Sequence, residues 1–228
     1  MIESRDDRPW GIGHAAAAVF LALTASTVVG LAVGPDLTDA ELFRFVLPAQ
    51  ALTQIGVVAW LASQSRRRRI SLGFRFEAGD WVGLPLGVAF QYAASLALLP
   101  FVLWFLDGEA PTQEVVESAA GLAGFDVVFV ILGAGLLAPL AEELVFRGAL
   151  LRALMVRGGT RFATWVSAGA FAALHLLDPN AWLVVPVLFV LGVVLARVTI
   201  GTGRLGKAIA IHVGFNLIAV VSLLWVGS

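Results

Sequence analysis

The residues of this sequence that could perform chemistry are ionisable side chains embedded in apolar runs. Glu142, Glu143 and Arg147 fall within one such run. A charged side chain at the centre of a bilayer costs on the order of 3 kcal/mol on insertion scales, so intramembrane ionisable residues are functional candidates by default. Glu143 and Arg147 are four residues apart and share a helix face, which favours an ion pair and leaves Glu142 free to face a different cavity. The alternative is a packing pair, with Glu142 reaching water.

Two further apolar runs carry His175, His212 and Asn216. Taken singly each is a weak signal, because a lone histidine in a membrane helix often only bonds a neighbouring helix. A carboxylate beside an imidazole can activate water, and a second imidazole with an amide can hold a developing oxyanion. Counting from flanking basic residues at 1.5 Å per residue places Glu142 about 15 Å and Asn216 about 14 Å deep. The same count places His212 at about 8 Å and His175 at about 21 Å, so the four groups are predicted to converge below the surface that carries the basic residues.

Other hydrolytic machineries are excluded by what the sequence lacks. The chain has no cysteine, which rules out disulfides, thiolate nucleophiles and cysteine-bound metals. It has no H-E-x-x-H and no G-x-S-x-G motif, and its apolar runs hold no paired aspartates. What remains is water activated by glutamate and histidine, or by a metal that they bind.

The elements that must position these groups are membrane-spanning helices. Residues AVILMFWYC make up 59% of the 228 residues and charged residues only 14%, with several apolar runs of about 20 residues, long enough to cross the hydrocarbon core. We predict an all-α polytopic transmembrane helix bundle, a single integral membrane domain over residues 1–228. The seven predicted spans are residues 13–33, 42–62, 81–106, 125–151, 162–177, 181–198 and 208–226.

The distribution of charge predicts how this bundle is oriented. Seven spans put the N-terminus on one side with the loops near Arg66, Arg157 and Arg204. Every Lys and Arg lies on or next to that side except Arg44, which is opposite, and Arg147, which lies within a span. The positive-inside rule makes this side cytoplasmic, with the C-terminus outside. Residues 70–80 are predicted as a polar loop, with an interfacial helix as the alternative.

At the polar residues the chain resembles the CPBP family of intramembrane proteases, which includes the glutamate-type CAAX prenyl endopeptidases. The family's E-E-x-x-x-R motif reads Glu142-Glu143-Leu144-Val145-Phe146-Arg147. Its F-x-x-x-H motif reads Phe171-Ala172-Ala173-Leu174-His175, and its H-x-x-x-N motif reads His212-Val213-Gly214-Phe215-Asn216. Three motifs in order, each on a predicted span, place the catalytic core in residues 125–226. One departure is Gly206, where relatives often carry a tryptophan.

The resemblance implies a role for each motif residue. Glu142 with His175 would activate the attacking water, and His212 with Asn216 would stabilise the oxyanion. Glu143 and Arg147 would orient the first carboxylate. The family is often labelled metalloprotease, and Glu142, His175 and His212 could offer Zn²⁺ two nitrogens and a carboxylate. The sequence does not separate that mechanism from a metal-free one, which we favour, and no cofactor is assigned.

Three functions compete at this point. The leading hypothesis is an endopeptidase that cleaves a membrane-associated protein or peptide, with no nucleic-acid partner. The second is a non-proteolytic scaffold, or an immunity or protective factor, of the same family. The third is a small proton-coupled carrier, which the absence of visible repeats disfavours. The Ala/Arg/Val/Gly-rich composition suggests a bacterial cell membrane.

Overall fold

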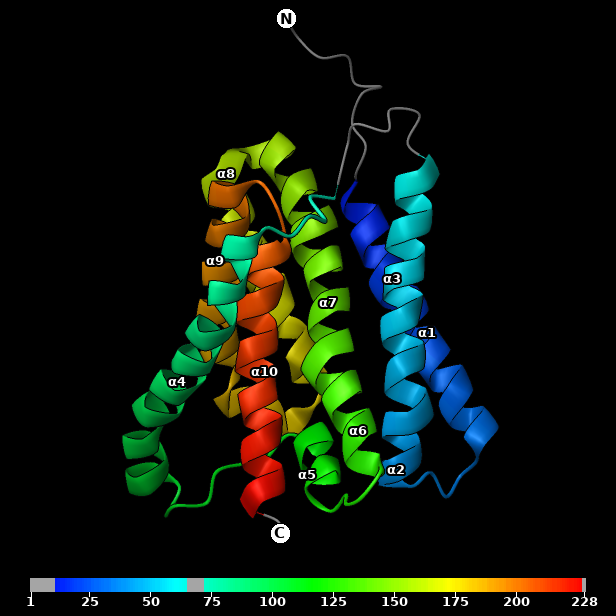
Figure 1. Cartoon of the computed structure of the whole chain (residues 1–228), viewed down its shortest axis with the longest axis vertical. Helices are drawn as coiled ribbons and strands as arrows, with labels where there is room; N and C mark the ends of the chain where they lie inside the picture. Colours follow the sequence, from blue (N-terminus) through cyan, green and yellow to red (C-terminus); the bar gives the residue numbers. More distant parts are fainter. Residues whose placement is uncertain (1–10, 65–71, 227–228) are drawn as a thin grey trace, which may run out of the picture.

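The computed structural model describes residues 11–64 and 72–226, and every regular element in these ranges is a helix. The predicted all-α polytopic bundle is therefore confirmed (Figure 1). The helices labelled α are α-helices, η2, η4 and η5 are π-helices, and η3, η6 and η7 are 3₁₀ helices. In chain order they are α1 (Ile12–Val33), α2 (Asp39–Glu41), η2 (Leu42–Val46), α3 (Leu47–Gln64), η3 (Ala78–Val82), α4 (Gly83–Phe105), α5 (Glu114–Ala120), α6 (Asp126–Val130), η4 (Ile131–Leu137), α7 (Ala138–Glu143), η5 (Leu144–Leu150), α8 (Leu151–Leu174), η6 (His175–Leu177), η7 (Pro179–Leu183), α9 (Val185–Thr202) and α10 (Gly206–Val226).

Five segments of the described chain are long and apolar enough to cross a bilayer. They contain the first six predicted spans, because the stretch Asp126–Leu177 holds both the fourth and the fifth. The seventh coincides with α10, which is apolar over Gly206–Ser222. The sixth begins later than predicted, at Val185, because the turn after Asp178 is extended by the 3₁₀ helix η7.

The loop predicted near Arg157 takes the form of a break within one helix, α8, at a single residue. Gly159 has a φ of 74° and a ψ of 177° and divides α8 in two. A side chain would be strained in that conformation, which glycine adopts at little cost. The chain reverses at this point, so that the second half of α8 runs back along the bundle (Figure 1).

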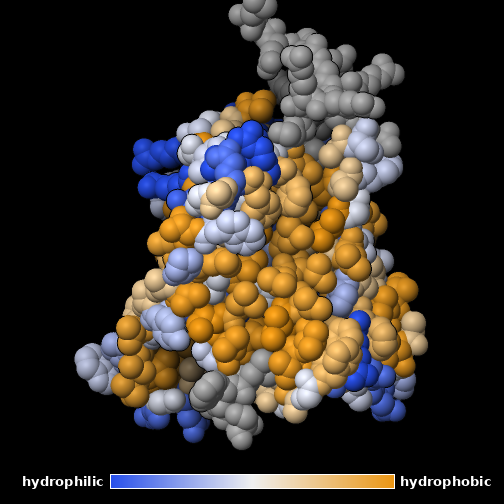
Figure 2. Space-filling model, viewed as in Figure 1, coloured by the Kyte–Doolittle hydropathy of each residue, from blue (hydrophilic) through white to orange (hydrophobic). Residues whose placement is uncertain are grey.

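The two ends of the bundle differ from its middle in polarity. The break in α8 and the turn between α9 and α10 lie at the upper end in Figure 1, and α5 lies at the lower end. Figure 2 shows an apolar face between these ends and strongly hydrophilic residues gathered at the upper end, over α8 and α9. This arrangement suits a bilayer around the middle of the bundle. Which end faces the cytoplasm stays a prediction.

Glycines bring α4 close to α10, the helix that carries His212 and Asn216. A Cβ atom at Gly87 would lie 1.9 Å from the carbonyl oxygen of Ile211, and one at Gly214 would lie 2.2 Å from that of Leu84. Gly83 sits one turn before Gly87, and a Cβ atom there would lie 2.8 Å from the carbonyl oxygen of Lys207. Small residues of this kind let membrane helices pack backbone to backbone.

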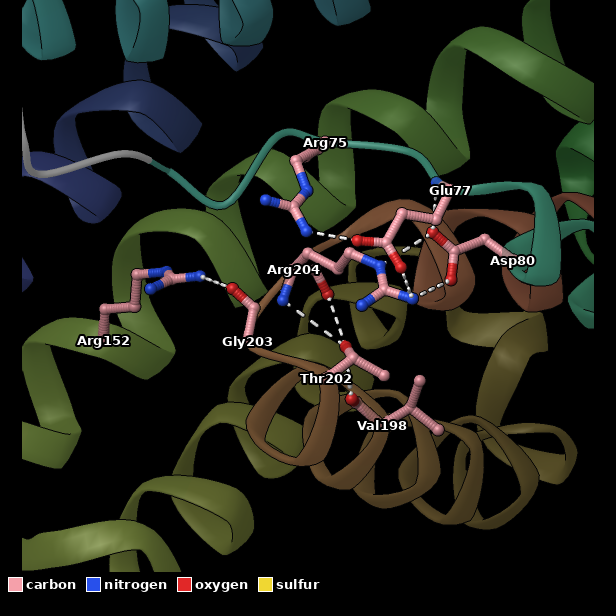
Figure 3. Close-up of polar contacts among 8 residues, drawn as sticks. All are labelled: Arg75, Glu77, Asp80, Arg152, Val198, Thr202, Gly203 and Arg204. Atoms are coloured by element: carbon pink, nitrogen blue, oxygen red, sulfur yellow. Dashed lines mark hydrogen bonds and ion pairs between the residues drawn. The ribbon is translucent and has the colours of Figure 1, made fainter.

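A strap formed by residues 72–82 crosses the start of α10 (Figure 3). Asp80 is almost fully buried and accepts two hydrogen bonds of 3.0 Å from Arg204, which also pairs with Glu77 at 2.9 Å. The hydrogen bond to Asp80 is the main cause that raises the pKa of Arg204 above its ordinary value. Backbone bonds from Leu205 and Gly206 to the strap complete the attachment. The strap thereby fixes where the last helix begins.

The strap also explains the departure from the family pattern at Gly206. A Cβ atom there would lie 2.5 Å from Oδ2 of Asp80 and 2.7 Å from the carbonyl oxygen of Arg75. The space that a tryptophan would need is filled by the strap backbone. Residues 70–80 were predicted as a polar loop, with an interfacial helix as the alternative. Their described part has no regular structure up to Glu77 and ends in the 3₁₀ helix η3. Residues 70 and 71 lie outside the described residues.

Candidate active site

The candidate site is built around a fully buried ion pair inside the bundle. Arg147 Nη1 donates to Oε1 of Glu143 at 2.9 Å, and neither side chain is exposed. Arg147 Nη2 donates to the carbonyl oxygen of Gly192 on α9 at 3.3 Å. The predicted i, i+4 pair is therefore present. It also ties the helix that carries it to α9.

His212 joins the two glutamates. Its Nδ1 lies 3.0 Å from Oε1 of Glu143, and its Nε2 lies 3.5 Å from Oε2 of Glu142. His212 and Glu143 are 2% and 0% exposed, whereas the Glu142 side chain is 24% exposed. One carboxylate thus holds the imidazole from the dry interior, and the other meets it from the side that solvent can reach.

The aromatic ring of Phe171 sits among these groups. The Arg147 guanidinium lies 4.5 Å from the ring centroid, within the range of a cation–π interaction. The same ring packs edge to face against His212 at 5.5 Å and against His175 at 5.1 Å. Phe171 is fully buried, so both imidazoles pack against one buried aromatic ring.

His175 is held by its own helix. Its Nδ1 lies 3.0 Å from the carbonyl oxygen of Phe171. A carbonyl only accepts, so Nδ1 carries the hydrogen, and Nε2 of the neutral ring is left as an acceptor. Among the described residues, His175 makes no hydrogen bond or ion pair with Glu142. The joint activation of water by Glu142 and His175 stays a prediction, and the imidazole beside Glu142 is that of His212.

Asn216 is oriented by a carbonyl that a proline leaves free. Asn216 Nδ2 donates to the oxygen of Ala134 at 3.1 Å. In the π-helical segment η4, Ala138 donates to Gly133, so the next donor in this register would bond Ala134. That next residue is Pro139, which has no N–H. The carbonyl of Ala134 is therefore available to the amide of Asn216.

Sequence reasoning missed two residues that support the ion pair. Gly192 supplies the carbonyl that Arg147 bonds, and it faces Ala168 so closely that a Cβ atom at Gly192 would lie 3.0 Å from the Cα atom of Ala168. Ser167, fully buried on α8, donates to the carbonyl oxygen of Phe146 at 3.0 Å. A glycine facing a small residue on a neighbouring span was the available signal for Gly192. Ser167 carried no signal in its spacing.

The residues proposed as metal ligands do not fit a metal ion in this arrangement. In the described ranges, no three or more His, Cys, Asp or Glu side chains are placed so that they could hold one. Glu142 and His212 are neighbours, whereas no hydrogen bond or ion pair joins His175 to either of them in the described part of the chain. We therefore derive no step through a metal.

Comparison with protein families now bears on the site. Residues 124–218 match the family model described as Type II CAAX prenyl endopeptidase Rce1-like. The resemblance to this family is confirmed. The matched segment runs from just before α6 into α10 and contains all six motif residues, so the match supports a membrane-embedded protease role in general. Neither the comparison with curated proteins nor the comparison with solved structures gave a match.

Proposed function

We propose that this protein is an intramembrane endopeptidase in which Glu142 is the general base. The observation that carries the proposal is the position of His212, whose two ring nitrogens face Glu143 and Glu142 at 3.0 and 3.5 Å. Buried Glu143 fixes the plane of the ring and, through its bond to Arg147, is itself fixed. Preorganisation of this kind is what a catalytic imidazole needs, because reorientation during the reaction would add to the barrier.

The charges of the cluster support proton transfer at Glu142. Two carboxylates and one guanidinium sum to −1 with His212 neutral, and a single added proton makes the cluster neutral. A low-dielectric site favours neutrality, and we propose that this proton lies on Nε2 of His212, which faces Oε2 of Glu142 at 3.5 Å. Glu142 is the partly exposed member of the cluster and is therefore the one that water and substrate reach.

The proposed reaction uses these groups in order. Glu142 takes a proton from water as its oxygen attacks the peptide carbonyl carbon, and Nε2–H of His212 donates to the oxyanion that forms. Asn216, on the same face of α10, is proposed as the second oxyanion donor. The C–N bond then breaks as Glu142 returns its proton to the leaving amine. Nε2 of His175 is an acceptor and is proposed to help Glu142 to orient the water.

The substrate class is a membrane-associated peptide or protein whose scissile bond can reach Glu142. The description of the matched family names a CAAX prenyl endopeptidase. We do not assign prenylated CAAX substrates to this chain. We propose that the site is approached from the cytoplasmic side, because Glu142 is predicted about 15 Å below the basic surface.

The test is cleavage by the purified protein in liposomes, with membrane peptides and a prenylated CAAX peptide as substrates. Glu142→Gln is expected to lower the rate by 10²–10⁴-fold, the usual contribution of a general base. Glu117→Gln, a carboxylate on α5 away from the cluster, is the matched control and should cleave normally. Normal cleavage by Glu142→Gln would refute the assignment.

Two further outcomes separate the competing mechanisms. If a chelator abolishes cleavage and Zn²⁺ restores it, the metal-free mechanism is wrong. If the wild-type protein cleaves no substrate while a cellular phenotype needs the protein but tolerates Glu142→Gln, the scaffold or immunity function replaces the enzyme.

A further inference from the structure

A second polar site lies outside the candidate active site, at the upper end of the bundle. A groove of about 480 Å³ runs between the second half of α8 and the end of α9. Its lining combines two arginines, two threonines and a tryptophan with the last turn of α9. The lining residues are Thr160, Arg161, Thr164, Trp165, Arg197, Ile200 and Gly201.

The groove is positively charged. Arg161 and Arg197 both line it, one from each helix, and no acidic residue does. Within the described ranges neither guanidinium has an ion-pair partner, although most other arginines at this end of the bundle are bonded. Arg204 pairs with Asp80, and Arg152 donates to the carbonyl oxygen of Gly203. Two arginines that line one groove from neighbouring helices suit a phosphate, which guanidinium groups bind through forked N–H donors.

The wall of the groove that continues toward the middle of the bundle is apolar. Trp165 follows Arg161 by one helical turn and stacks on Phe189 of α9, with ring centroids 5.7 Å apart. Val190, which follows Phe189 in α9, is about half exposed. The order from the end of the bundle inward is thus arginine, tryptophan, then aliphatic and aromatic surface, which is the order of headgroup, interface and acyl chain in a lipid.

We propose that this groove binds an anionic phospholipid, with its phosphate between Arg161 and Arg197 and its acyl chains along the Trp165–Phe189 surface. Basic pockets between membrane helices recognise such headgroups, and each basic residue near the surface contributes about fivefold in affinity. A soluble phosphate would use the arginines but would gain nothing from the apolar wall. The site is separate from the Glu142 cluster, so the inference does not rest on the proposed function.

The experiment measures lipid retained by the purified full-length protein by native mass spectrometry, with phosphatidylglycerol and phosphatidylcholine as probes. Wild type is expected to retain phosphatidylglycerol in preference. Arg161→Gln/Arg197→Gln should bind it about 25-fold more weakly, from two contributions of about fivefold. Arg157→Gln is the matched control, since Arg157 lies at the same end but bonds the carbonyl oxygen of Ala153 outside the groove.

Three outcomes would overturn the proposal. The double variant could bind phosphatidylglycerol as tightly as wild type, or Arg157→Gln could lose as much affinity as the double variant, which would mean unspecific surface charge. Inorganic phosphate could displace bound phosphatidylglycerol as effectively as free lipid does, while Trp165→Ala leaves the affinity for the lipid unchanged. That result would assign the groove to a soluble anion. Thermal melting of each variant in detergent checks folding, and Arg161→Lys/Arg197→Lys, which keeps both charges, should recover most of the binding.

Discussion

At the scale of single residues, the side chain of Arg147 is fully buried and pairs with Glu143, which His212 also contacts. Removing one member of a buried pair leaves an uncompensated charge, which is strongly destabilising. Replacing both members by groups of similar size without charge is much less costly. The ion pair therefore has a structural role that can be measured apart from catalysis.

Glu143→Gln is expected to destabilise the protein by about 3–5 kcal/mol, because Arg147 loses its counter-charge in the dry interior. Glu143→Gln/Arg147→Met should recover most of that loss and remain inactive, since His212 stays without its anchor. Denaturation in detergent gives the first quantity and the cleavage assay the second. A double variant as unstable as Glu143→Gln alone would mean that the pair is not coupled in this way.

The sequence predicted some contacts of the candidate site and not others. The i, i+4 pair of Glu143 and Arg147 was predicted and is present, because both residues lie on one helix at a fixed spacing. The contact of Glu142 with His212 was not predicted. Motif order names the residues of a site, but not which helix faces turn toward one another.

At the scale of elements, π-helical segments explain that gap. The segments η4 and η5 flank α7, which carries both glutamates. A turn of π-helix contains more residues than a turn of α-helix. Side chains that follow a π-helical segment therefore point in other directions than they would in a continuous α-helix. Spacing arguments assume 3.6 residues per turn. The direction of Glu142 could therefore not be derived from its position in the sequence.

Pro139 tests the link between this irregularity and the site. Pro139→Ala would supply an N–H that competes with Asn216 for the carbonyl of Ala134. Stability should hold or rise, because proline is unfavourable within a helix. The cleavage rate should fall by about 10-fold, roughly the value of one modest hydrogen bond. Asn216→Ala should then add little to Pro139→Ala, and a fully additive loss would contradict the link.

The contact between α4 and α10 gives the next prediction. Gly87→Ala would drive a methyl group into the backbone of Ile211 and push α10 away, so both stability and activity are expected to fall. The loss should be at least 1–3 kcal/mol, the range for overpacking. Gly56→Ala in α3 is the control, because nothing lies within 4 Å of a Cβ atom there. Equal melting temperatures for the two variants would refute a close α4–α10 contact in the membrane.

At the scale of the whole molecule, the apolar middle and the hydrophilic ends were predictable from composition and charge. Long apolar runs and the placement of arginines needed no knowledge of packing. The strap over α10 was not predictable, because it depends on Asp80 meeting Arg204 across more than a hundred residues of chain. Long-range ion pairs leave no periodic signal in a sequence.

The orientation can be tested directly because the chain has no cysteine to remove. Arg157, near the break in α8, and Glu109, between α4 and α5, are both exposed. Each would be replaced by a single cysteine, and its labelling by a membrane-impermeant maleimide would be measured in intact and in lysed cells. We expect Glu109→Cys to react in intact cells and Arg157→Cys only after lysis. The reverse pattern would place the arginine-rich end outside and overturn the predicted topology.

The unequal exposure of the two adjacent glutamates has a consequence for inhibitor design. A small molecule entering the site would meet one face of Glu142 and the Nε2 edge of His212, while Glu143 and Arg147 stay sealed behind them. Its polar end should therefore offer both a donor for the carboxylate and an oxygen for the imidazole, as a hydrated ketone does. A purely anionic warhead aimed at Arg147 would find no path to it.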